Sequence, residues 1–90
     1  MASNMQDRLK LEIKKLILET LNITEIEPVE INNSAPLFGD NNPLGLDSID
    51  ALEIIMALQE KYGVRIDDRN LSRVVLQSIN SIAEFLDKKI

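Results

Sequence analysis

The spacing of apolar residues constrains the fold of this chain more than any other feature of its sequence. In three segments, apolar residues recur at three- and four-residue intervals, which places them on one stripe of a helix. A helix of this kind needs a partner surface that covers its stripe. The spacing therefore predicts helices that pack through their apolar faces. The stripes are Leu9, Ile13, Leu16, Ile17 and Leu21 in the first segment, Ala51, Ile54, Ile55, Leu58 and Tyr62 in the second, and Ile79, Ile82, Phe85 and Leu86 in the third.

Capping residues mark where the expected helices begin and end. Ser, Asn and Asp side chains accept hydrogen bonds from the first backbone N–H groups of a helix, and Gly63 suits the left-handed residue that closes one. The sequence thus predicts an all-α fold, a small antiparallel bundle of three main helices and one short helix. The expected bounds are Ser3 or Asn4 to about Leu21, Asp47 or Ser48 to Lys61 or Tyr62, Asp67 or Asp68 to about Val75 for the short helix, and Ser78 to Lys89.

A long connection separates the first two helices. From Asn22 to about Leu46 the helical spacing breaks down, prolines and glycines are frequent, and no strict alternation indicates a strand. Loops longer than about 12 to 15 residues are uncommon in compact domains unless they are functional or contain short turns. We therefore expect the apolar residues of this loop to pack onto the bundle. They are Ile26, Val29, Ile31, Leu37 and Phe38.

Length and composition limit the chemistry that this chain can perform alone. Its 90 residues are expected to form one domain, residues 1–90. It has no cysteine and no histidine, which removes disulfides, thiolate metal ligands, the commonest zinc ligand and the usual general base. A calcium loop beginning at Asp40 fails on spacing, because its fifth position is Leu44 and its twelfth is Ala51. We expect neither a metal site nor an enzyme.

The negative charge of the chain is concentrated in one segment. A formal net charge of -5 argues against nucleic acid as a partner, since its phosphates would repel the protein. Residues 39–60 contain five acids and no Lys or Arg, which predicts a surface that docks on a basic partner. The first 20 residues mix charged and apolar positions and match neither a signal peptide nor a membrane span. We therefore expect a cytoplasmic protein that does not insert into membranes.

A serine between two carboxylates lies where the second helix is expected to begin. In the run from Gly45 to Asp50, Asp47 stands at the N-cap position and Asp50 three residues later, which is the spacing of a capping box. Those acids alone would leave Ser48 an ordinary first-turn serine. The outer face of this helix pairs apolar residues with acids, so it is either a transient protein interface or a surface covered by the loop or a neighbouring helix. That face holds Ile49, Leu52, Glu53, Met56 and Glu60.

The run from Leu44 to Tyr62 resembles the acyl carrier proteins, whose signature is a glycine, one residue and Asp-Ser-Leu or Asp-Ser-Ile, followed by an acidic amphipathic helix. The order of the helices, the long loop, the chain length and the acidity extend the resemblance over nearly the whole chain. It implies that a phosphopantetheinyl transferase attaches 4′-phosphopantetheine from coenzyme A to Ser48. The arm would carry acyl intermediates as thioesters in fatty acid, polyketide-like or related lipid biosynthesis, and the carrier itself would catalyse nothing.

The same resemblance implies roles for further side chains. It implies a carrier, which we expect to be a monomer, that moves between acyl-processing enzymes with basic docking patches. Partner recognition is expected from Asp47, Ile49, Asp50, Glu53, Met56 and Glu60. An acyl cavity between the helices is expected from residues that would equally serve as plain core, namely Phe38, Ile54, Leu58, Tyr62 and Ile79.

Two features depart from the carriers of fatty acid synthesis. The approach to the serine is a few residues longer, with a bulge at Gly39–Pro43, and Arg65, Arg69 and Arg73 occupy a region that is usually acidic. These differences favour a specialised pathway at least as much as the housekeeping one. Two other functions stay open. One is an aminoacyl carrier of the D-alanyl or peptidyl kind, against which Asp50 counts, and the other is a helical adaptor without a prosthetic group.

Overall fold

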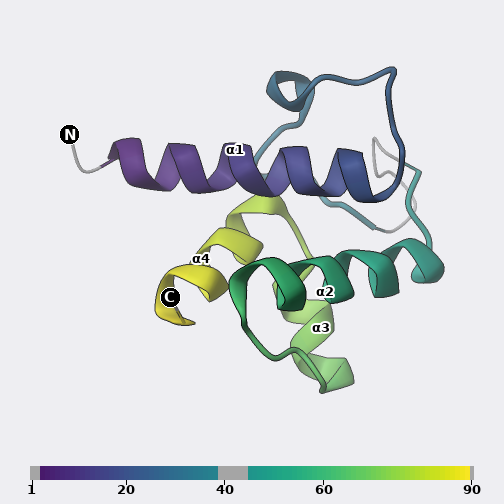
Figure 1. Cartoon of the computed structure of the whole chain (residues 1–90), viewed down its shortest axis with the longest axis vertical. Coiled ribbons are helices and arrows are strands. Elements are labelled where there is room, and N and C mark those ends of the chain that lie inside the picture. The colour runs from purple at the N-terminus through teal and green to yellow at the C-terminus, as the bar shows by residue number, and fades with distance from the viewer. Residues whose placement is uncertain (1–2, 39–44, 90) are drawn as a thin grey trace.

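Helices form all the regular structure that the computed structural model describes, which covers residues 3–38 and 45–89. The all-α class is therefore confirmed. The antiparallel order of the bundle stays a prediction, and the bulge expected at Gly39–Pro43 lies outside the described residues. The elements are α1 (Ser3–Thr20), the single-turn 3-10 helix η1 (Pro28–Glu30), α2 (Ser48–Tyr62), α3 (Arg69–Val75) and α4 (Ile79–Lys89) (Figure 1).

The first helix, α1, runs along one side of the molecule and supplies one wall of the core (Figure 1). Ile13 and Ile17 are fully buried, as their spacing predicts, and Leu18 is buried as well. Leu18 lies outside the expected stripe. It is buried nonetheless because α1 contacts α2, α4 and η1, and three neighbours cover more of the helix surface than one stripe. The helix begins at Ser3, in agreement with the expected start, and the cap expected from Ser3 or Asn4 stays a prediction.

The connection between α1 and α2 reaches the core at separate points. Ile31 and Leu37 are buried, and Ile26 and Phe38 pack partly buried against the core, as expected. The expectation for Val29 is wrong, since its side chain is 79% exposed. Val29 lies in η1, which buries none of its residues, and the connection reaches full burial only at Ile31, directly after that turn.

Two backbone hydrogen bonds join this connection to the turn between α3 and α4. The Leu37 N–H donates to the Gln77 carbonyl at 3.0 Å, and the Asn80 N–H donates to the Asn33 carbonyl at 3.0 Å. Buried backbone groups need such partners, because leaving them unpaired costs free energy. The loop before α2 and the turn after α3 are thereby held side by side.

The remaining helices close the core against α1. Ile54 and Leu58 of α2 and Ile79, Ile82 and Leu86 of α4 have no exposed surface. The radius of gyration is 12.2 Å, and a compact chain of this length has a radius of about 12 Å. Buried residues of the expected stripes of α2 and α4 therefore belong to one hydrophobic core.

The expected caps of the later helices are confirmed. Gly63 closes α2 in the left-handed conformation, at φ 66°, and its N–H donates to the carbonyl four residues earlier at 2.9 Å. Asp68 caps α3 by accepting the N–H of Leu71 at 3.0 Å. Ser78 Oγ accepts the N–H of Ser81 at 3.2 Å and caps α4. These contacts fix where each helix begins or ends.

Candidate functional site

The beginning of α2 is a complete capping box. Asp47 lies in extended backbone at the N-cap, and its Oδ1 accepts the N–H groups of Ile49 and Asp50, each at 3.0 Å. In return, Asp50 Oδ2 accepts the Asp47 N–H at 3.1 Å. These bonds satisfy backbone donors that a helix N-terminus otherwise leaves without partners. The predicted role of the two acids as caps is confirmed.

Ser48 is the first residue of α2, and its side chain is exposed. Within residues 3–38 and 45–89 its hydroxyl makes no hydrogen bond, so no described base activates it. Two residues fix the path of the backbone into α2: Gly45 adopts a left-handed φ of 64°, and Leu46 is buried. The local structure therefore holds one unbonded hydroxyl at the positive end of the α2 dipole.

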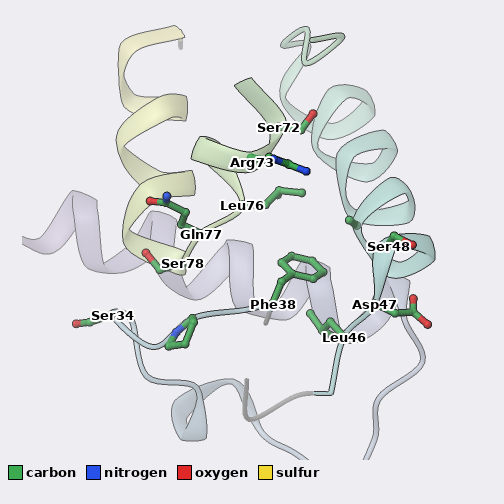
Figure 2. A pocket seen from close by; sticks show the side chains of 12 residues that line it. Ser34, Phe38, Leu46, Asp47, Ser48, Ser72, Arg73, Leu76, Gln77 and Ser78 are labelled. Atoms are coloured by element: carbon green, nitrogen blue, oxygen red, sulfur yellow. The ribbon is translucent and has the colours of Figure 1, made fainter. Parts of the chain in front are cut away.

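A pocket of about 700 Å³ lies beside Ser48, between α2, the loop before it and α3 (Figure 2). Its apolar wall comes from Phe38, Leu46, Ala51 and Leu76. Figure 2 shows Ser48 on one side of this space and Ser34 and Ser78 on the opposite side. The other lining residues are Pro36, Asp47, Ser72, Arg73 and Gln77.

Most of this pocket could not be anticipated from local sequence patterns. Its walls come from residues 34–38, 46–51 and 72–78, which only the tertiary fold brings together. Arg73 and Leu76 were not expected near Ser48. Helical spacing indicates which face of a helix is buried, but it does not indicate which distant segment faces that helix. The only signals present were the apolar Phe38 and Leu46 in the loop.

Four of the five residues expected to line an acyl cavity have other surroundings. Ile54, Leu58 and Ile79 are fully buried in the core, and Tyr62 is half-buried against it. Phe38 alone among the five lines the pocket beside Ser48. An acyl cavity lined by all five stays a prediction.

The outer face of α2 combines large apolar side chains with acids. Ile49, Leu52 and Met56 are 67%, 62% and 65% exposed, and Glu53 and Glu60 are exposed beside them on the same helix. The described part of the loop and the neighbouring helices therefore do not cover this face. An apolar surface bordered by acids has the composition of a transient protein interface. The sequence did not predict a further exposed apolar side chain, Val74 of α3, which is 59% exposed.

Comparison with known proteins identifies the class to which this fold and site belong. The family model described as the phosphopantetheine attachment site matches residues 11–86. The chain is also 32% identical, over 78 residues, to the acyl carrier protein of Solidesulfovibrio magneticus, a match that spans 87% of this chain and 90% of that protein. The chain therefore belongs to the acyl carrier protein family, whose members hold acyl groups on a covalent 4′-phosphopantetheine and are carriers, not catalysts.

The N-terminus of α2 has the properties that a phosphopantetheine group requires. An exposed hydroxyl can form a phosphodiester, and a helix N-terminus favours the negative charge of that ester. The adjacent pocket offers an apolar surface that the organic arm can follow. In the parts of the chain that the structure describes, no helix is long and apolar enough to cross a membrane.

Proposed function

We propose that Ser48 is the residue that bears the arm, and that the chain presents acyl groups to enzymes of fatty acid, polyketide-like or related lipid biosynthesis. The observation that carries this proposal is the exposed, unbonded Ser48 hydroxyl at the first residue of α2, next to the pocket. Once attached, the arm supplies the thiol that this cysteine-free chain lacks, and acyl groups travel on it as thioesters.

Attachment is a phosphoryl transfer from coenzyme A to the serine. Ser48 Oγ forms a bond to the phosphorus next to the pantetheine, the bond from that phosphorus to the bridging oxygen breaks, and adenosine bisphosphate leaves. The proton of the hydroxyl passes to a base of the transferase, because the described residues of the carrier place no base against Ser48. The carrier contributes an accessible nucleophile, and the transferase contributes the activation.

The two acids that flank Ser48 are compatible with a phosphodiester there. Both carboxylates accept backbone N–H groups in the capping box, which offsets part of their negative charge. The dipole of α2 favours an anion at the same place. Asp47 and Ser48 are also exposed to solvent, where salt screens the remaining repulsion.

The outer face of α2 is the surface that we propose for partner recognition. Its exposed apolar residues would supply contact area, and its acids would steer the carrier toward basic patches on the transferase and on acyl-processing enzymes. This face begins at Ile49, directly after Ser48 in α2, so a partner that binds it lies next to the proposed attachment residue. The proposed recognition residues are Asp47, Ile49, Asp50, Glu53, Met56 and Glu60.

Intact-mass analysis of the apo protein tests the attachment site. After incubation with coenzyme A and a broad-specificity phosphopantetheinyl transferase, the wild-type chain is expected to gain the mass of one phosphopantetheinyl group. Ser48→Ala should gain nothing, whereas Ser72→Ala, which removes another serine that lines the pocket, should load like the wild type. A wild-type chain that several transferases leave unmodified would support the adaptor function instead.

A further inference from the structure

Arg73 is the one cationic residue in the wall of the pocket beside Ser48. It lies on α3, and Figure 2 shows its side chain extending toward α2, above Leu76. Among the residues that the structure describes in this wall, Asp47 on the far side is the other charged one. A guanidinium group presents several N–H donors in a fork that matches a carboxylate. The pocket therefore has an apolar surface with a donor for an anion at its edge.

No carboxylate in the described residues pairs with this guanidinium. Within residues 3–38 and 45–89, the side chain of Arg73 makes neither an ion pair nor a hydrogen bond. Asp47, which lines the α2 side of the pocket, and Asp50, its partner in the capping box, both accept backbone N–H groups there. Figure 2 shows the Asp47 carboxylate directed away from Arg73. Among the described residues, no side chain thus neutralises the positive charge at the pocket.

The rest of the pocket wall is mainly apolar and carries hydrogen-bonding groups as well. Ser34, Ser72, Gln77 and Ser78 add hydroxyl and amide groups to the apolar side chains. An acyl group that stays in the pocket therefore meets both apolar and hydrogen-bonding surfaces.

We propose that this pocket binds an acyl group that ends in a carboxylate, and that Arg73 pairs with that carboxylate. The proposal rests on the attachment of the arm at Ser48, since the arm delivers the acyl group to the pocket. The phosphodiester is a less suitable partner for Arg73, because it is fixed to the α2 side of the pocket, whereas Arg73 is on the α3 side. Arg73 is thus a specificity-determining residue for dicarboxylic acyl cargo.

The test compares two cargoes of equal length on the intact protein. The wild-type chain is loaded with pantetheine that carries either a succinyl or a butyryl group through a stable amide, and backbone N–H signals are followed by NMR. The succinyl form is expected to shift the signals of Arg73, Leu76 and Gln77 relative to the unacylated holo protein, and the butyryl form to leave the Arg73 signal in place. Equal shifts from both cargoes would overturn the proposal.

Two variants of α3 complete the test. Arg73→Gln should abolish the shifts specific to the succinyl group, whereas Arg69→Gln, an exposed position on the same helix outside the pocket lining, should retain them. If Arg73 instead binds the phosphodiester, the unacylated holo protein will already shift the Arg73 signal and the succinyl group will add nothing, which contradicts the proposal. Intact mass separates the two claims: an unloaded chain refutes attachment at Ser48, and a loaded chain without dependence on Arg73 refutes this inference alone.

Discussion

At the scale of single residues, two hydroxyl groups of this chain have opposite environments. Ser48 is exposed and its hydroxyl makes no hydrogen bond within the described residues, which leaves it open to a modifying enzyme. Tyr62 is half-buried, and its hydroxyl donates to Glu12 Oε1 at 3.2 Å. That bond joins the end of α2 to α1. Burial first, and then the neighbouring Glu12 carboxylate, raise the pKa of Tyr62 to about 12.

The raised pKa of Tyr62 predicts a loss of stability at high pH. The folded state keeps the phenol proton to a higher pH than the unfolded state, whose pKa is near 10.0, so this contribution is fully present below pH 10 and is lost as pH rises toward about 12. Because the chain has a single tyrosine, its tyrosinate absorbance reports this pKa directly. Glu12→Gln should lower the pKa toward its ordinary value. An unchanged pKa would show that Glu12 does not contribute.

At the scale of elements, the N-terminus of α2 serves both stability and the proposed attachment. The capping box fixes the first turn of the helix and with it the position of Ser48. Gly45, in its left-handed conformation, and the buried Leu46 hold the chain that leads into this turn. The acids at the helix start therefore have a structural role whether or not a partner contacts them.

Loss of the Asp47 cap should weaken the whole domain measurably. Replacing an N-cap Asp by Ala costs about 1 kcal/mol, because backbone donors lose their acceptor. Asp47→Ala is therefore expected to lower the free energy of unfolding by about that amount in urea denaturation. Glu53→Ala removes a charge from the same helix without removing a cap and should change stability by less. Equal effects of the two substitutions would argue against the capping role.

The elements also show what local sequence patterns can and cannot predict. Spacing predicted the buried stripes of α2 and α4, and chemistry predicted the caps Asp47, Asp68 and Ser78, because both depend on residues close in sequence. Leu18 was missed because its burial depends on how many neighbours α1 has. The Arg73 side of the pocket was missed for a related reason, since it depends on where α3 packs relative to α2.

In the whole molecule, the net negative charge and the exposed apolar residues of α2 both favour binding to a basic partner. A net charge of -5 repels nucleic acid and favours encounters with basic surfaces. The acids and apolar residues exposed on α2 concentrate that tendency on one face. A 90-residue domain has a small core, which limits its stability. Ile49, Leu52 and Met56 add nothing to that core, because folding leaves their side chains exposed. Exposed apolar residues on α2 are expected if successive partner proteins cover this face.

Recognition by a basic partner should depend on salt. We expect kcat/KM for loading by a phosphopantetheinyl transferase to fall by about tenfold as salt is raised well above physiological ionic strength, because screening weakens electrostatic steering. Glu53→Gln with Glu60→Gln should flatten this dependence, and Glu84→Gln, an exposed acid on α4, should not. A loading rate that salt leaves unchanged would exclude the acidic face as the steering surface.

The most direct test of the account locates the arm within the chain. Wild-type protein is loaded to saturation with coenzyme A and a transferase, digested, and sequenced by tandem mass spectrometry. We predict that the phosphopantetheinyl group lies on the peptide that contains Ser48, with fragment ions that assign it to that residue. Attachment to another serine, or no attachment at saturating enzyme, would contradict the central claim.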